Sequence, residues 1–137
     1  MTIGVEKVIE KINNVTCNKS FLLELPWPSS KLSPNAREHW TTTSRLRKLY
    51  RARCKAIGEQ VGLGYLRGSK NAVRVDLTFF PPDRRARDMD NMLASMKSGL
   101  DGLADAMGVD DSRWKIAMEV SDPKKGGVVL VQVFEGV

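Results

Sequence analysis

Four acidic residues in the second half of the chain have the types and spacing needed to hold a metal ion. Asp88 and Asp90 are two positions apart after a predicted strand, and Asp110 and Asp111 follow the next predicted helix. Magnesium prefers hard oxygen ligands, and proteins usually supply one or two carboxylates while water and substrate phosphate complete the octahedron. Because residues i and i+2 of an extended segment point the same way, Asp88 and Asp90 can converge on one ion.

These carboxylates also have a purely structural interpretation. Aspartates that precede a helix serve as N-caps and interact favourably with its dipole, and aspartates that follow a helix-ending glycine such as Gly108 are ordinary turn residues. A single helix from near Asp90 to Met107 would be about 27 Å long. For a third carboxylate to reach the first two, strand 113–120 must bring the chain back, or the helix must be shorter or bent. The sequence leaves both interpretations open.

Lys97 is the basic residue best placed to join the acidic ones. It lies within about 20° of Asp90 around an ideal helix, and Asp101 falls on the same stripe. A lysine in this position can face a phosphate or a charge that develops in a transition state. The alternative is a surface pair between Lys97 and Asp101 at i, i+4 spacing, which stabilises a helix only slightly.

Positive charge is concentrated in two segments. Lys and Arg outnumber Asp and Glu by 22 to 16, which gives a net charge of +6 and favours a polyanionic partner such as nucleic acid. One basic set precedes the first aspartates and suits a site that binds phosphate and metal together, while the other forms a stripe on a predicted helix that can follow a phosphate backbone. The sets are Arg84, Arg85 and Arg87, then Arg47, Lys48, Arg51 and Lys55. A solvated helix face is the alternative for the stripe.

Hydrophobic periodicity indicates the elements that position these residues. Alternation of apolar and polar residues predicts strands over 21–25, 73–79, 114–120 and 128–134. Apolar stripes at helical spacing predict helices over about 43–61 and 90–107. The turn-rich segment between the last two strands is a hairpin signal. The order β-α-β-α-β-β predicts a single α+β domain, a small mixed sheet with helices packed on it.

Length and composition narrow the class of protein. A chain of 137 residues with 42% hydrophobic content is long enough for one folded domain. We expect an N-terminal extension over 1–20, with a short amphipathic helix over 4–14, and the domain over 21–137. No segment approaches the roughly 20 apolar residues of a membrane helix, and the N-terminus lacks the features of a secretory signal. Cys17 and Cys54 have no zinc-type spacing, so we expect reduced thiols in a cytoplasmic protein.

One combination of short motifs is more specific than any of its parts. It comprises R-D-M-D-N at 87–91, K-S-G-L-D-G-L at 97–103 and D-D-S at 110–112. With L-P-W-P-S-S at 25–30 and K-K-G-G at 124–127, it resembles the RusA family of Holliday junction resolvases from about residue 22 to the C-terminus. The resemblance implies a RusA-like fold, a homodimer that binds four-way DNA junctions, and dependence on Mg²⁺, for which Mn²⁺ can substitute.

The resemblance assigns catalytic roles to Asp88, Asp90, Asp111 and Lys97, with the three aspartates as metal ligands. The family lysine stands four residues after the second aspartate, where this chain has Ala94, whereas Lys97 stands seven after it. Both spacings fall on nearly the same helix face, but seven residues rise about 10.5 Å and four only about 6 Å. Either the extra residues are absorbed before the helix, or Lys97 is not the equivalent of that lysine.

The expected function is a structure-selective endodeoxyribonuclease that resolves Holliday junctions by paired symmetric nicks in recombination and repair, encoded by a bacterial host or a phage. Two other readings remain open. One is a phage endonuclease with a broader range of branched DNA, including D-loops and flaps, and the other is a non-catalytic basic DNA-binding module. His39, the single histidine, is interpreted as structural, and Trp27 and Trp40 as packing or loop anchors.

Overall fold

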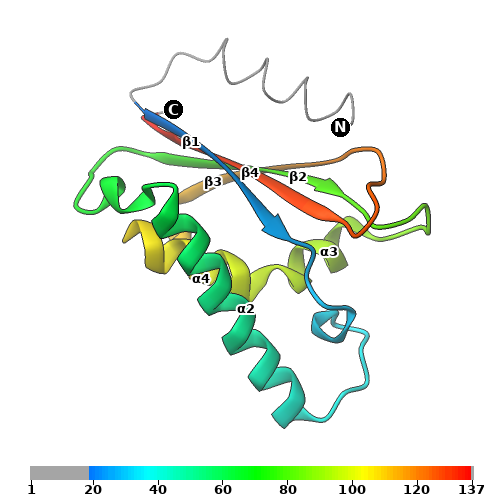
Figure 1. The fold of residues 1–137 in the computed structure, drawn as a ribbon. Coiled ribbons are helices and arrows are strands. Elements are labelled where there is room, and N and C mark those ends of the chain that lie inside the picture. Colours follow the sequence, from blue (N-terminus) through cyan, green and yellow to red (C-terminus); the bar gives the residue numbers. More distant parts are fainter. Residues whose placement is uncertain (1–18, 137) are drawn as a thin grey trace. The chain divides into compact units, whose positions relative to one another are not determined.

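The computed structural model describes residues 19–136, which form an α+β fold (Figure 1). The described chain is organised as two compact units. The sheet unit contains residues 19–27, 69–84 and 112–136, and the helical unit contains residues 28–68 and 85–111. The predicted α+β class is therefore confirmed. Residues 1–18, including the helix predicted over 4–14, lie outside the described residues.

Four strands form one mixed sheet in the order β1-β4-β2-β3. Strand β4 pairs antiparallel with both β1 and β2, whereas β3 pairs parallel with β2. The strands are β1 (Lys19–Pro26), β2 (Val73–Phe80), β3 (Trp114–Val120) and β4 (Val128–Glu135). Each lies where hydrophobic alternation predicted it, to within two residues at either end, because alternate residues of a strand face opposite sides of the sheet.

The predicted hairpin between the last two strands is wrong. Strand β2 lies between β3 and β4, so the connection over 121–127 passes the end of β2. Two hydrogen bonds hold it there, because the Ser121 N–H donates to the Phe79 carbonyl and the Lys124 N–H to the Pro81 carbonyl, both at 2.8 Å. Strand β4 is buried along most of its length, as expected of a strand with neighbours on both sides.

The helical unit contains α2 (Trp40–Gln60), α3 (Met89–Ser95) and α4 (Lys97–Met107). Helix α2 begins three residues before its predicted start because His39 caps it. The His39 Nδ1 atom accepts a hydrogen bond from the Thr41 N–H at 3.2 Å. This contact confirms the predicted structural role of His39. None of the helices in the described part of the chain is long and apolar enough to cross a membrane.

The single helix predicted over 90–107 is wrong, because α3 and α4 are separated at Met96. The Ser95 hydroxyl donates to the Asn91 carbonyl oxygen at 2.8 Å, a contact that often bends helices. The Met96 N–H contacts the carbonyls of both Met92 and Leu93, at 3.2 and 3.0 Å, which tightens the last turn of α3. As a result, Lys97 is the first residue of a new helix.

Small residues allow α2 and α4 to approach closely. A Cβ atom on Gly102 would collide with the Arg51 carbonyl oxygen, and a Cβ atom on Gly99 would lie 2.5 Å from Cε2 of Tyr50. Both glycines belong to the K-S-G-L-D-G-L run, and both are buried. We conclude that these two glycines allow α4 to pack closely against α2. Lys97, in the same run, is exposed.

Cys54 is fully buried in the helical unit and forms no disulfide. Burial raises the pKa of its thiol to about 11, so the thiol is neutral and unreactive near neutral pH. Burial also raises the pKa of Tyr50, whose hydroxyl donates to the Met96 sulfur at 3.2 Å. Cys54 is a free cysteine in the structure, and Cys17 lies outside the described residues.

Candidate metal and DNA site

Asp88 and Asp90 lie at the start of α3. Asp88 occupies the N-cap position in an extended conformation, with φ −79° and ψ 135°, yet its side chain makes no capping hydrogen bond. Asp90 lies in the first turn, where the helix dipole favours a negative charge. Both residues are exposed, and neither carboxylate has a hydrogen bond or ion pair with another residue of the described chain. Simple capping therefore does not account for Asp88.

Lys97 joins two carboxylates of the helical unit. Its Nζ atom lies 2.5 Å from Oδ2 of Asp111 and 3.0 Å from Oδ1 of Asp101. The predicted surface pair with Asp101 is present, but the contact with Asp111 is shorter and spans fourteen positions of sequence. Hydrogen bonds from Lys97, first to Asp111 and then to Asp101, raise the pKa of the lysine. The ammonium is therefore fully charged at neutral pH.

The path of the chain explains how Asp111 reaches Lys97. Helix α4 ends at Gly108, whose φ of 68° places it in the left-handed region that closes many helices. The following residues turn back, and Asp111 begins a short 3-10 turn, Asp111–Arg113. Because the helix is broken at Met96, the chain has to return only along α4, which has eleven residues and is about 16 Å long. A continuous helix of about 27 Å would have kept Asp111 far from the residues at its start. With the shorter α4, Asp111 reaches Lys97.

Asp88, Asp90 and Asp111 do not form a single metal-binding group in the described chain. Among residues 19–136, no group of three or more His, Cys, Asp or Glu side chains is arranged to hold a metal ion. Asp111 instead faces the ammonium of Lys97. The donor chemistry nevertheless suits Mg²⁺, because Asp88 and Asp90 offer uncommitted hard oxygen ligands and the ion needs only one or two protein carboxylates. Lys97 contacts Oδ2 of Asp111, so a metal ion at that oxygen would have to displace the ammonium.

The basic residues before the aspartates remain near the surface. Arg84 and Arg85 are exposed and Arg87 is half-buried. Nη1 of Arg87 donates to the Arg85 carbonyl oxygen at 3.1 Å, which holds the Arg87 side chain against its own segment. Arginine guanidinium groups in such a segment can donate several hydrogen bonds to a phosphate.

One member of the basic stripe on α2 is committed to an internal partner. Nε and Nη2 of Arg51 donate to the two carboxylate oxygens of Asp105 on α4, at 2.7 and 2.9 Å. The hydrogen bond from Arg51 is the main cause that lowers the pKa of Asp105. Arg47, Lys48 and Lys55 are exposed. Sequence reasoning missed the pairing, because fifty-four positions separate Arg51 from Asp105 and no local spacing signals it.

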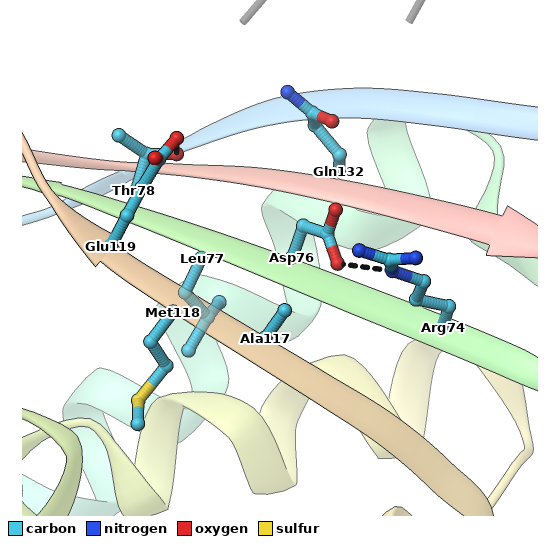
Figure 2. Close-up of a pocket in the computed structure, with 8 residues that line it drawn as sticks. All are labelled: Arg74, Asp76, Leu77, Thr78, Ala117, Met118, Glu119 and Gln132. Carbon is cyan, nitrogen blue, oxygen red and sulfur yellow. Dashed lines mark hydrogen bonds and ion pairs between the residues drawn. The ribbon is translucent and has the colours of Figure 1, made fainter. Parts of the chain in front are cut away.

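The sheet unit carries a small hollow of about 80 Å³ on β2, β3 and β4 (Figure 2). Its polar side chains include Arg74 and Asp76, which form an ion pair of 2.7 Å, and Gln132, which stands on β4 above them in Figure 2. Ligand pockets usually measure about 300–1,000 Å³. The hollow has room for a few water molecules at about 30 Å³ each, so we assign it no substrate.

The two tryptophans singled out from the sequence behave differently. The Trp27 ring meets the Phe79 ring edge-on, with centroids 6.0 Å apart, and both residues belong to the sheet unit. This contact confirms the predicted packing role of Trp27. Trp40 is 73% exposed and lies against the His39 ring, at a centroid distance of 5.8 Å. Trp40 is therefore a surface residue at the start of α2, and its predicted packing role is limited to that ring contact.

The sequence is similar to a bacterial protein but matches no model of a known protein family. A protein of Xylella fastidiosa (strain Temecula1 / ATCC 700964), named "Uncharacterized protein", is 46% identical over 114 residues. The matched region covers 81% of this chain and 74% of the Xylella protein. Identity at this level over most of both chains reflects common descent. The chain therefore belongs to the same protein family as this Xylella fastidiosa protein.

Proposed function

We propose that the protein is a Mg²⁺-dependent endodeoxyribonuclease that resolves four-way DNA junctions by paired symmetric nicks. The observation that carries the proposal is the Lys97–Asp111 ion pair. It joins two residues of the R-D-x-D-N, K-x-x-x-D-G-L, D-D combination across fourteen positions of sequence. A chance similarity of short motifs gives no reason for these two side chains to meet. The pair also supports Lys97 as the equivalent of the family lysine, although the family spacing points to position 94, where this chain has alanine.

The proposal assigns distinct roles to the charged side chains. Asp88 and Asp90 would hold Mg²⁺ at the start of α3, and Asp111 would join them once Lys97 moves from it toward the DNA. The bound ion would stabilise the charge that develops on the phosphate and would activate the attacking water. Lys97, which is charged at neutral pH, would bind a non-bridging oxygen of the same phosphate and help to neutralise it.

Basic side chains would hold the DNA by its phosphates without reading its sequence. The exposed members are Arg47, Lys48 and Lys55 on α2, with Arg84 and Arg85 before α3, and Arg87 is half-buried beside them. Arg51 would contribute less, because its guanidinium is already bonded to Asp105. Two cuts in opposed strands require two sites, which a two-fold symmetric homodimer supplies.

A non-catalytic DNA-binding module is the second candidate. Two observations favour it. Asp111 is paired with Lys97, and no group of three side chains that could hold a metal ion is found in the described chain. In this case the Lys97 bridge would only fasten the end of α4, and the basic residues would supply all of the DNA affinity.

Cleavage assays with three labelled substrates separate these functions. The purified protein is incubated with a four-way junction, a flap and a linear duplex of the same length, each in Mg²⁺ and in EDTA. We expect symmetric nicks in the junction alone, and only with Mg²⁺. Cuts in both branched substrates would instead indicate the broader endonuclease. Binding without cleavage in Mg²⁺ or Mn²⁺ would overturn the nuclease and leave the binding module.

A further inference from the structure

Strand β3 forms one edge of the sheet and keeps large apolar side chains exposed. It pairs only with β2, so its other side has no strand beside it in the described chain (Figure 1). Ile116 is 43% exposed and Val120 is 45% exposed. Exposed edge strands readily pair with another strand, and natural proteins usually protect them with charges, bulges or prolines. The seven residues of β3 contain no proline and form an unbroken parallel ladder with β2.

The sequence of β3 is complementary to itself. When two copies pair antiparallel about a two-fold axis through Ala117, each residue lies opposite the one equally far on the other side. Lys115 then faces Glu119 of the second copy, and the symmetry produces this opposite-charge pair twice. Ile116 faces Met118 in the same way. Opposite charges and apolar side chains that face each other directly across two strands are the pairs that stabilise sheets.

The other edge of the sheet offers no equivalent. Two-fold antiparallel pairing places residues opposite each other only if they point to the same face, so their numbers must differ by an even amount. Lys19 and Glu24 are the charged residues of β1, and they differ by five. Strand β1 also ends at Pro26, which has no N–H to donate to a ladder.

We propose that the protein dimerises through β3, so that two four-stranded sheets join into one continuous sheet across a two-fold axis at Ala117. The partner is a second copy of this chain, because β3 is complementary to itself and an identical strand forms both charge pairs. This interface contacts itself through the same surface on both subunits, as two-fold dimers do. The inference does not depend on the proposed nuclease, and it names the surface that would bring two sites together.

A charge swap tests the interface. Both side chains are exposed, and Glu119 also accepts a hydrogen bond of 3.5 Å from the Thr78 hydroxyl. Lys115→Glu places four carboxylates in two facing pairs, and Glu119→Lys places four ammonium groups there. We expect each single variant to raise the dimer dissociation constant at least about tenfold, since each turns two attractions into repulsions. The double variant Lys115→Glu, Glu119→Lys restores opposite charges and should return the constant to near that of the unaltered protein.

Sedimentation velocity over a concentration series measures the constant for all four proteins. A protein that stays monomeric at 15.3 kDa throughout the series would overturn the proposal. So would a dimer that both single variants form as tightly as the unaltered protein, because the interface would then lie elsewhere. Far-ultraviolet circular dichroism of the variants verifies that loss of the dimer is not loss of the fold.

A cross-link tests the position of the axis. Residues directly opposite in an antiparallel pair have Cα atoms about 4.5–5.5 Å apart, within the range of a disulfide. In a Cys17→Ser background, Ala117→Cys should therefore form a covalent dimer under mild oxidation. Lys115→Cys is the matched control, because its symmetry mate lies four residues, or about 13 Å, along the strand. Equal cross-linking of both variants, or of neither, would contradict this register.

Discussion

At the scale of single residues, the ion pair between Lys97 and Asp111 matters most to the proposed site. Under the proposal, Lys97 would assist catalysis and Asp111 would bind the metal ion, so their contact links the two functions. The ammonium lies 2.5 Å from Oδ2 of Asp111, where a cation bound by that oxygen would also lie. Two positive charges cannot share that position, so Mg²⁺ at Oδ2 of Asp111 would compete with Lys97. Under the proposed function, this competition would let Asp111 bind Mg²⁺ in the complex with DNA and pair with Lys97 when no metal is bound.

Replacing Lys97 with Met should separate its two roles. The change removes the competing charge, so Mn²⁺ should bind more tightly, while cleavage of the junction should slow by roughly 100-fold because one electrostatic contact to the phosphate is lost. Mn²⁺ binding is measured by electron paramagnetic resonance, and cleavage under single-turnover conditions. Asp101→Asn is the matched control, because it removes the other partner of Lys97 and leaves Asp111 intact. Unchanged metal affinity in Lys97→Met would show that Asp111 is not a ligand.

At the scale of elements, the contact between α2 and α4 depends on glycine. Gly102→Ala should lower the free energy of unfolding by about 2 kcal/mol or more, because the new methyl group meets the backbone of Arg51, which cannot move aside cheaply. Urea denaturation followed by circular dichroism measures the loss. Gly64→Ala is the control, since the nearest atom to its new Cβ is 3.9 Å away. Equal stability of the two variants would rule out the close approach.

The Arg51–Asp105 pair joins the same two helices and should make their contact sensitive to acid. The folded protein lowers the pKa of Asp105 below its ordinary value of 3.8, so the pair contributes its full stability above that pH and loses it as the pH falls through the lowered pKa. The urea midpoint of the unaltered protein should therefore exceed that of Asp105→Asn at pH 7, and the gap should close towards pH 3. A gap that is constant with pH would show that the charge of Asp105 does not matter.

The sequence predicted individual elements better than their arrangement. Alternation located β2 because Val73, Val75, Leu77 and Phe79 are all buried on one face, and this signal is local. The order of strands is not local, so the turn-rich segment after β3 was wrongly interpreted as a hairpin although β2 lies between its ends. A shorter or bent helix was one expectation, but the break could not be located at Met96 because the apolar stripe continues through it. The meeting of Lys97 with Asp111 depended on that break and on the turn after Gly108.

At the scale of the whole molecule, the candidate site and the candidate interface belong to different compact units of the chain. The aspartates and Lys97 belong to the helical unit, whereas β3 belongs to the sheet unit. Charge exchange at Lys115 and Glu119 should therefore alter paired cutting without altering the chemistry of a single cut. On a junction held in supercoiled DNA, a monomeric Lys115→Glu variant should release singly nicked circles, whereas the dimer should release linear product. A variant that linearises the DNA as the unaltered protein does would separate dimerisation from paired cutting.

The most direct test of the central claim is Mg²⁺-dependent cleavage of a four-way junction by the unaltered protein and by Asp90→Asn. The substitution keeps the shape of the side chain and removes one ligand charge, so we expect cleavage to fall at least about 100-fold while junction binding stays equal or becomes tighter. Asp122→Asn, a change at an exposed aspartate outside the motif, should cut at the normal rate. Full activity of Asp90→Asn would contradict the assignment of the aspartates to the metal site.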